Sequence, residues 1–549
     1  MSEKSRKDAL DFIANETQFH LGFLPTEQSS PITRGLDKRF AESVENGVKN
    51  LQEVDQNVLA MARKVFAGNE FKKLADTIES TLRNGKRVVF SGCGATGRLS
   101  ILLESAWRDG AARGTVPSAC ADSVFSIMTG GDFALIRSVE FFEDYINFGR
   151  RQVQMLNLSA GDTLVAITEG GETSSVLGTV FEALDRGLSV FLMFNNPADL
   201  LAEHIERSRK AIRDPRVTVL DLSCGPMALA GSTRMQATTS EQLVAGAALE
   251  TAACRLAGTP VPDYAADFAK LLDALSSPAC VKAIADYIRF ESGVYKKDGK
   301  LTYFADRFLL DIFTDTTERT PTFMLPPFRK ANDKVSQRPW TFVKNPLFST
   351  ADTWKHAMNR SLRCLSWTSK DLADMGAPES VASRPPAISE NDMLLIHIGN
   401  EDIDERCETA EDAAVLVTIG APSQELSSAY SALTKGFAKR NAIDVRAFSV
   451  PSFGETPIEI MDHMAIKLIL NTVSTGVMVV LGRVTSNWMS WVDCTNKKLL
   501  DRGTRLISEI GGLDYQESCI RLFAALEEIA KNPPSADRVS AVQYVLKRL

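Results

Sequence analysis

Histidine is scarce in this chain, and its cysteines lack the spacing of a metal site. The 549 residues include five histidines, which lie far apart, and nine cysteines, which contain no CxxC pair. Zinc and iron sites are built from clusters of such side chains, and secreted small domains depend on regular cysteine frameworks. We therefore expect reduced thiols, no metal and no cofactor.

The sequence also lacks an excess of positive charge and a long apolar run. Its 62 Lys and Arg against 69 Asp and Glu give a formal net charge of -7, whereas binding a phosphate backbone needs a positive face. No run of about 18 apolar residues and no apolar leader is present. We predict a cytoplasmic protein with neither a nucleic acid nor a membrane as partner, so that any anion site must be local.

The length exceeds what one hydrophobic core normally organises, so two domains are expected. The sequence Gly-Thr-Pro-Val-Pro at 258–262 interrupts a helical pattern and marks a linker. We predict an N-terminal helical segment (1–75), a first α/β domain (76–258), a second and degenerate α/β domain (280–496) and a helical tail (497–549).

Short β-branched runs alternate with amphipathic stretches in both predicted domains, which is the pattern of a parallel sheet with crossover helices. Strands are expected at 87–91, 163–168, 189–194 and 217–222, and again at 301–305, 393–398, 414–419 and 445–450. The predicted fold class is α/β, with two flavodoxin-like, doubly wound parallel-sheet domains in tandem. Two similar sets in one chain suggest an ancient duplication.

The first candidate binding segment is Gly94-Ala95-Thr96-Gly97, directly after a predicted strand and at the start of a helix. Glycines let the backbone approach a ligand, and a helix N-terminus offers unpaired N–H groups to an anion. A dinucleotide-binding turn begins the same way, and a tight βα turn without a ligand is the remaining interpretation.

Two further segments have the same character. Thr168, Glu169, Gly170 and Thr173 follow another strand, at the sheet edge where open α/β folds bind ligands. Ser232 and Arg234 lie at the start of a later helix, where a hydroxyl and a guanidinium can both donate to a ligand. The hydroxyls could instead serve only as helix caps.

Several separated motifs resemble the N-acetylmuramic acid 6-phosphate etherase and glucokinase regulatory protein branch of the sugar isomerase (SIS) superfamily. They are GATGRLS (94–100), GSTRM (231–235), KLILNTVSTG (467–476) and TNKKL (495–499). The resemblance implies two SIS domains that form an internal pseudo-dimer, with assembly into a homo-oligomer left open. It also implies an anionic hexose as ligand, phosphorylated or sulfonated.

Individual roles follow from the same resemblance. Thr96 falls where the family places a phosphate- or sugar-binding serine, Thr168 looks like another ligand position, and Lys467 matches a basic residue that the C-terminal half contributes to the pocket. The base of the etherase family, which removes a proton next to the sugar carbonyl, matches Glu143. The family's acid position falls on Ala106, where this sequence departs from the pattern.

A base without a leaving-group acid can still interconvert an aldose and a ketose, so isomerisation is the leading prediction for the activity. His463 and Lys467 are four apart, hence on one helix face, and are candidates to polarise or reprotonate the sugar oxygens. Glu104 would point to a different helix face from position 106. The alternatives are an etherase-like lyase and a non-catalytic, sugar-phosphate-sensing regulator of a sugar kinase.

One polar cluster has no role in the resemblance. Residues 315–323, with sequence Asp-Thr-Thr-Glu-Arg-Thr-Pro-Thr-Phe, are expected to form a solvated loop. The alternative is that they line the cleft between the domains, with Arg319 binding an anion.

Overall fold

Two parallel sheets form the framework of the protein in a computed structural model that describes residues 2–139, 141–532 and 540–549. The first sheet has the strand order β2-β1-β3-β4-β5, and the second has β7-β6-β8-β9. The first order is that of a flavodoxin-like, doubly wound sheet. The predicted fold class, two parallel-sheet α/β units in tandem with helices at both ends of the chain, is confirmed.

The strands of the first sheet are β1 (Val88–Gly92), β2 (Val124–Met128), β3 (Thr163–Ile167), β4 (Ser189–Phe194) and β5 (Val217–Asp221). Those of the second are β6 (Leu301–Phe304), β7 (Thr341–Lys344), β8 (Ala413–Thr418) and β9 (Lys439–Asp444). Every residue of β1 and β3 is buried, as expected for strands that helices cover on both faces.

The strand predictions hold best in the first sheet. The four strands expected there correspond to β1, β3, β4 and β5, whereas β2, β7 and β9 were not predicted. Two strand predictions in the second half were wrong. Residues 393–398 form no strand, because their first residues belong to the helix Glu390–Leu394, and residues 445–450 form a turn after β9. Apolar runs of this length do not distinguish a buried strand from a buried helix or turn.

The helices before and within the first sheet are α1 (Glu3–Asn15), α2 (Leu36–Glu42), α3 (Val44–Glu53), α4 (Asp55–Phe66), α5 (Asn69–Arg83), α6 (Ala95–Arg113), α7 (Ile146–Met155), α8 (Ser174–Asp185), α9 (Ala198–His204), α10 (Glu206–Ile212) and α11 (Gln236–Ala257). Those of the second half are α12 (Tyr264–Leu275), α13 (Pro278–Tyr295), α14 (Leu309–Phe323), α15 (Thr350–Met358), α16 (Ser369–Asp374), α17 (Glu379–Ala382), α18 (Glu390–Leu394), α19 (Gln424–Leu433) and α20 (Ile460–Val480). The C-terminal helices are α21 (Lys497–Gly511), α22 (Tyr515–Lys531) and α23 (Ala541–Leu546).

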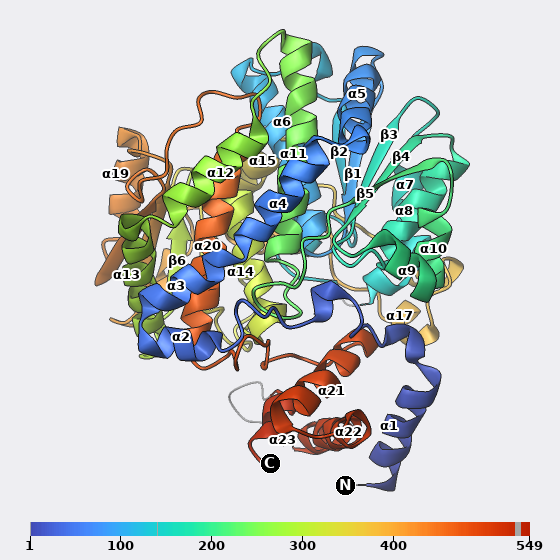
Figure 1. Ribbon diagram of the computed structural model, residues 1–549. Coiled ribbons are helices and arrows are strands. Elements are labelled where there is room, and N and C mark those ends of the chain that lie inside the picture. Colours follow the sequence, from blue (N-terminus) through green and yellow to red (C-terminus); the bar gives the residue numbers. More distant parts are fainter. Residues whose placement is uncertain (1, 140, 533–539) are drawn as a thin grey trace.

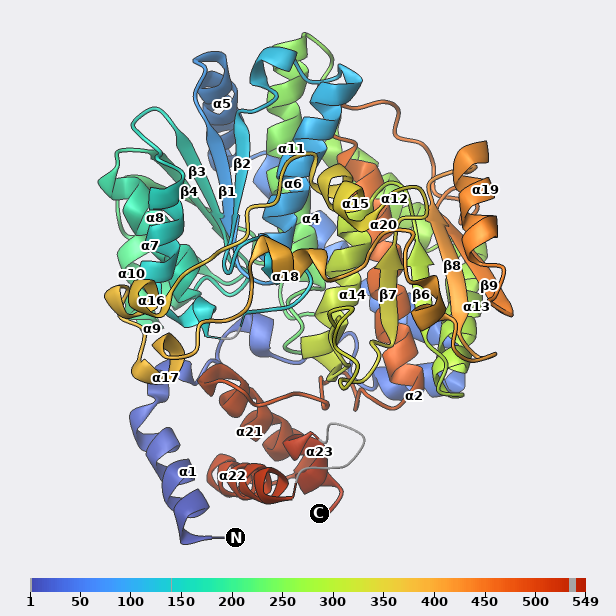
Figure 2. The ribbon, with the colours of Figure 1, turned by 180° about the vertical axis from the view of Figure 1, so that it is seen from behind.

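Four helices join the two halves. α6 and α11 come from the first half and α14 and α20 from the second, and α11 and α6 each contact a helix of the other half. Figure 2 shows the two sheets on opposite sides of this group of helices. Among the described residues, α20 is the helix long and apolar enough to cross a membrane, but 89% of its apolar window is buried inside the protein.

The C-terminal helices form a lobe at one end of the molecule, together with α1 (Figure 1). α22 packs against both α1 and α21, and Leu506, Leu522 and Val542 belong to a shared apolar core. Glu27 ties this lobe to the N-terminal segment because its carboxylate accepts hydrogen bonds from Arg502 and Arg505. The lobe brings the start of α21 beneath the first sheet.

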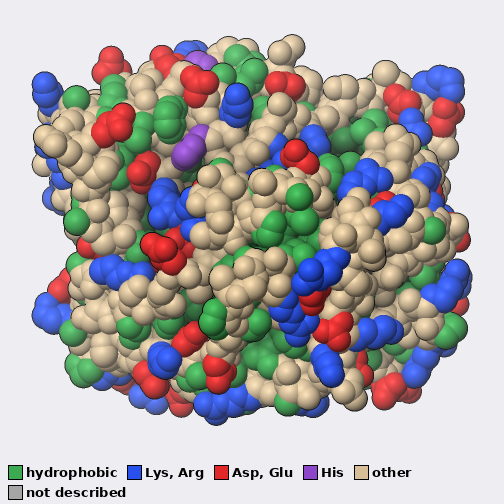
Figure 3. All heavy atoms as spheres, turned by 90° about the horizontal axis from the view of Figure 1, so that it is seen from above, with side chains coloured by type: hydrophobic (Ala, Val, Ile, Leu, Met, Phe, Trp, Pro, Cys, Tyr) green, Lys and Arg blue, Asp and Glu red, His purple; other side chains and the backbone are tan. Residues whose placement is uncertain are grey.

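The face opposite the lobe shows acidic and basic side chains interspersed, without a broad region of one sign (Figure 3). Such a mixture provides no extended positive footprint on this face for a polyanion. An anion that bound to this face would therefore need a local site.

Candidate functional site

A cavity of about 330 Å³ lies where β1, β2 and β3 end. The last part of α14 and residues 489–502, which lead into the lobe, also line it. Its lining comes from both halves of the chain and from the lobe. It includes Gly94, Ala95, Thr129, Arg137, Glu143, Asp144, Glu169, Thr173, Ser232, Arg234, Thr317, Glu318, Asn496, Lys498 and Arg502. The site is therefore assembled from segments far apart in the sequence.

The turn from β1 into α6 contributes Gly94 and Ala95 to the cavity. Gly94 has φ 58° and ψ -126°, which side chains other than glycine adopt only with strain. The helical hydrogen bonds begin when Arg98 N–H donates to the Gly94 carbonyl (3.1 Å). The N–H groups before it leave the helix N-terminus able to bind an anion.

Thr96 and Gly97, predicted in the same turn, do not line the cavity. Thr96 is fully buried, and its hydroxyl accepts from the Cys93 N–H (3.0 Å) and donates to the Cys93 carbonyl (2.9 Å). A Cβ added at Gly97 would lie 2.8 Å from Met128 Cγ and 3.0 Å from the Gly92 carbonyl oxygen, so the helix and strand approach closely here. Both residues hold the turn in shape.

In the turn after β3, too, only some of the predicted residues line the cavity. Glu169 and Thr173 line the cavity, whereas Thr168 and Gly170 do not. Thr168 is buried, and its hydroxyl donates to Thr173 Oγ1 (3.1 Å). The Gly170 carbonyl accepts from the Asn196 side chain (3.0 Å).

Ser232 and Arg234 both line the cavity, but their hydrogen bonding differs. The Ser232 hydroxyl is buried and has no hydrogen-bond partner among the described residues, so it is available to a ligand. Arg234 donates to Asp315 (3.0 Å) and to Thr475 Oγ1 (2.8 Å). Its charge is already compensated by the second half of the chain.

Glu143 is placed at the cavity by a short 3-10 turn, Phe142–Asp144. Asn496 Nδ2 donates to its carboxylate (3.3 Å). The charge of Glu143, and then that of Glu172, raises the pKa of Lys498 above its ordinary value, and Lys498 Nζ lies 3.7 Å from Glu172. Asn496 and Lys498 lie in the TNKKL motif, whose resemblance to the family predicted no role for either side chain.

A second carboxyl, Glu169, enters the cavity in different surroundings. Burial raises its pKa to about 8, and the charge of Glu318 adds to the rise. Glu318 projects from α14 and forms an ion pair with the fully buried Arg98. Arg98 lies in the GATGRLS motif and Glu318 in the polar cluster 315–323. Their pairing was not predicted, because it joins α14 to α6 across the two halves.

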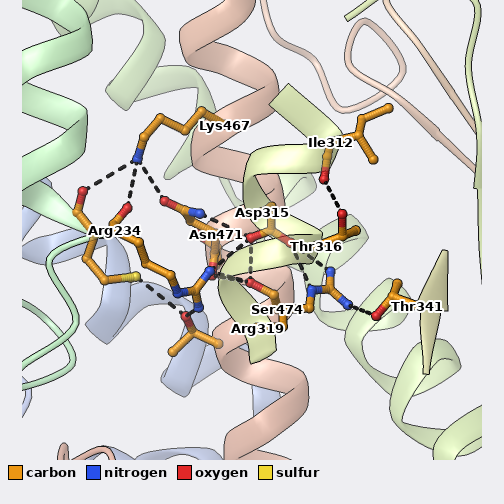
Figure 4. A network of polar contacts seen from close by, with 12 residues as sticks. Arg234, Ile312, Asp315, Thr316, Arg319, Thr341, Lys467, Asn471 and Ser474 are labelled. Carbon is orange, nitrogen blue, oxygen red and sulfur yellow. Dashed lines mark hydrogen bonds and ion pairs between the residues drawn. The ribbon is translucent and has the colours of Figure 1, made fainter. Parts of the chain in front are cut away.

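Lys467 and His463 lie on α20, outside the lining of this cavity. Lys467 Nζ donates to the Arg234 carbonyl (3.1 Å) and to Asn471 Oδ1 (2.8 Å), and burial lowers its pKa to about 7. His463 Nδ1 lies 2.7 Å from Asp311. Figure 4 shows Lys467 and Arg234 in one network of polar contacts between the halves.

The expected departure at the acid position is also visible in the structure. Ala106 is buried within α6 and cannot donate a proton. Glu104 accepts from the Ser126 hydroxyl (2.7 Å) and pairs with Arg360 (3.1 Å) and Arg363. Neither residue lines the cavity.

The expectation of a solvated loop at 315–323 was wrong. These residues form the C-terminal part of α14, and Arg319 is fully buried between Asp315 and Glu291. Thr317, Glu318 and Thr320 line the cavity, so the cleft alternative holds for part of the segment. The dense polar composition reflects a buried network rather than solvent exposure.

Comparisons with known proteins agree with the resemblance seen in the motifs. Residues 71–184 match the model of the glucokinase regulatory protein N-terminal SIS domain. The chain is 30% identical over 259 residues to the N-acetylmuramic acid 6-phosphate etherase of Synechococcus sp. strain CC9902, covering 46% of this chain and 74% of that enzyme. With N-acetylmuramic acid 6-phosphate etherase 1 of Bacillus licheniformis it shares 29% identity over 225 residues, covering 41% of this chain and 67% of that enzyme.

The chain thus spans about two thirds of the length of several bacterial relatives. Among solved structures, tagatose-6-phosphate ketose/aldose isomerase from Escherichia coli has a TM-score of 0.42 and 11% identity, covering 82% of this chain and 95% of that one.

Proposed function

This chain belongs to the branch of the SIS family that includes the N-acetylmuramic acid 6-phosphate etherases and the glucokinase regulatory protein, and we propose that its cavity binds a phosphorylated sugar. The α6 N-terminus and Lys498 supply donors and positive charge at the cavity. These suit a compact dianion. A sulfonate would satisfy the same donors.

We propose that the bound sugar undergoes elimination of an oxygen substituent, as in a carbon–oxygen lyase. The observation that carries this proposal is that Glu143 shares one cavity with the α6 N-terminus, with Asn496 and Lys498 beside it. A carboxylate so held is suited to remove the proton next to the sugar carbonyl. Because relatives at 29–30% identity are N-acetylmuramic acid 6-phosphate etherases, that compound is the first substrate to test.

The lyase is favoured over the isomerase that led the predictions from sequence, because those relatives are etherases. Isomerisation would use the same base and is supported by the absence of an acid at Ala106. A regulator that binds the sugar without turnover is supported by the match of residues 71–184 to a regulatory protein's domain. We therefore keep both as outcomes of the test.

The test is incubation with N-acetylmuramic acid 6-phosphate, hexose phosphates and sulfonated hexoses in deuterium oxide. Lactate release is expected from the first compound and supports the lyase. Aldose–ketose interconversion with deuterium uptake would indicate an isomerase instead. Saturable binding without exchange would indicate a regulator.

We propose that the halves form an internal pseudo-dimer through α6, α11, α14 and α20. The domain boundaries at 76–258 and 280–496, a cytoplasmic location and the state of further assembly stay predictions.

A further inference from the structure

The proposed elimination needs a proton for the departing oxygen, and the position where the family carries its acid does not supply one. Ala106 has no ionisable group, and Glu104 is occupied by Arg360 and Arg363 away from the cavity. An ether oxygen leaves slowly as an alkoxide, so a positioned acid accelerates the step considerably. The donor has to line the cavity.

Glu169 is the carboxyl that reaches the cavity from the turn after β3. This turn is separate from the Phe142–Asp144 turn that carries Glu143, so the two carboxyls enter from different elements. The Thr238 hydroxyl lies 3.5 Å from Glu169 Oε1. In the described part of the chain no lysine or arginine is within ion-pair distance of Glu169.

We propose that Glu169 is a catalytic residue, the general acid that protonates the departing oxygen while Glu143 removes the proton beside the carbonyl. The inference rests on the proposed lyase function. It adds the residue that replaces the acid missing at Ala106.

The step balances in atoms and charge. The C–H bond next to the carbonyl breaks, its proton passes to the Glu143 carboxylate, and its electron pair forms a C=C double bond. The bond from the neighbouring carbon to the ether oxygen breaks, and this oxygen keeps the electron pair and takes the proton of Glu169. A hydroxy compound leaves, and addition of water to the double bond in the reverse sense restores both carboxyls.

The surroundings of the two carboxyls suit these opposed roles. Burial and then the charge of Glu318 raise the pKa of Glu169 to about 8, while Lys498 acts in the opposite direction. Glu143 instead has the Asn496 amide and the Lys498 cation beside it. Two carboxyls in contrasting environments are the arrangement by which one site provides an acid and a base.

Two other carboxyls at the cavity, Glu318 and Asp144, fit the acid role less well. The Glu318 carboxyl is already engaged in an ion pair with Arg98. Asp144 directly follows Glu143 on the same turn. Burial and then the charge of Glu143 raise its pKa, but three cations, Lys498, Arg207 and Lys497, oppose this rise. Asp144 is nevertheless the competitor that an experiment has to separate from Glu169.

The experiment follows proton removal and bond cleavage separately, with N-acetylmuramic acid 6-phosphate as substrate. Deuterium uptake beside the carbonyl reports on Glu143, and lactate release reports on cleavage. Glu169→Gln should lower lactate release by about 10²–10⁴-fold while keeping deuterium uptake within about threefold of wild type. An analogue with chloride in place of the lactyl ether needs no protonation, so its cleavage should be nearly unchanged.

The experiment includes two further variants. Glu182 lies on α8 and pairs with Arg150 and Arg186, so Glu182→Gln should behave as wild type. Asp144→Asn separates the competing carboxyl from Glu169. Unchanged lactate release by Glu169→Gln, or loss of release only in Asp144→Asn, would overturn the assignment and leave the lyase function standing. If the wild type releases no lactate, the lyase function falls, and this assignment falls with it.

Folding of Glu169→Gln is checked by thermal unfolding and by binding of sorbitol 6-phosphate, which has no carbonyl. If that variant does not fold, the wild type itself provides the second measurement. Lactate release should fall at high pH while chloride elimination does not. Parallel pH curves for the two substrates would contradict the proposal.

Discussion

Lys498 lies beside two carboxylates, and this determines the charge of the cavity. Its ammonium is 3.7 Å from Glu172, and Glu143 raises its pKa above the ordinary value. A lysine with a raised pKa stays charged across the physiological pH range. Under the proposed function, a bound phosphate would therefore meet both the Lys498 cation and the N-terminal turn of α6.

Glu143→Gln should abolish turnover while sorbitol 6-phosphate binding is retained or tightens. The base is lost, which costs at least ~10²-fold in rate, and Lys498 loses a carboxylate that competes with the ligand. Initial rates and titration calorimetry measure the two effects, with the exposed Glu203→Gln as control. Unchanged turnover would remove Glu143 as the base.

The pH dependence of cleavage should follow Glu169. Its pKa is about 8, raised by burial and by Glu318 and Glu172, and lowered by Lys498. Glu241 of α11 is a further neighbouring carboxyl, whose own pKa burial and Glu169 raise. Because an acid must hold its proton, lactate release should be steady below this pKa and fall by about tenfold per pH unit above it. The test is to measure the rate of lactate release at saturating substrate from pH 6 to 10, a range of ~2 units on either side of the pKa. A rate that rises above pH 8 would contradict the prediction.

The N-terminal turn of α6 shows how one backbone conformation shapes the site. Gly94→Ala should weaken sorbitol 6-phosphate binding and lower the free energy of unfolding by about 1–3 kcal/mol, because alanine is strained at this φ and ψ. Its Cβ would meet nothing within 4 Å, so the effect is conformational. Denaturant unfolding and calorimetry measure the changes.

Gly293→Ala is the matched control for that prediction. Gly293 lies in α13 and also has nothing within 4 Å of an added Cβ. Alanine in a helix should therefore keep binding unchanged and stabilise the protein by about 0.5–1 kcal/mol. Equal losses in the two variants would show that backbone strain at Gly94 is not the cause.

The two halves are joined by a buried charge network, which makes Asp315 a determinant of overall stability. Asp315 accepts from Arg234 of the first half and pairs with Arg319 and Ser474 of the second (Figure 4). Asp315→Ala leaves two buried guanidinium groups less compensated. The expected loss is about 3–5 kcal/mol in the free energy of unfolding.

Denaturant unfolding measures this loss, and Asp286→Ala is the control. Asp286 lies on α13 in an exposed pair with Arg289, and such pairs contribute little. A loss no larger in Asp315→Ala than in Asp286→Ala would show that the network does not hold the halves together.

Features that depend on residues close in the chain were predicted from the sequence, whereas contacts between distant segments were not. Four of the five strands in the first sheet were predicted, since β-branched runs and glycine turns are local patterns. Gly94, Ala95, Glu143, Glu169, Thr173, Ser232 and Arg234 were predicted and line the cavity. Thr96, Thr168 and Lys467 have contacts elsewhere, because a sequence motif does not say which side of a turn or helix faces a ligand.

Local patterns were thus enough for the fold class, the two tandem units and the turns that end β1 and β3, since each depends on residues close in the chain. The composition of the cavity depended on packing between segments hundreds of residues apart. Glu318 from α14 and Lys498 from α21 meet Glu169 and Glu143 only when the halves and the C-terminal lobe are assembled. The charge around each carboxyl, and with it the division into acid and base that we propose, depends on that assembly.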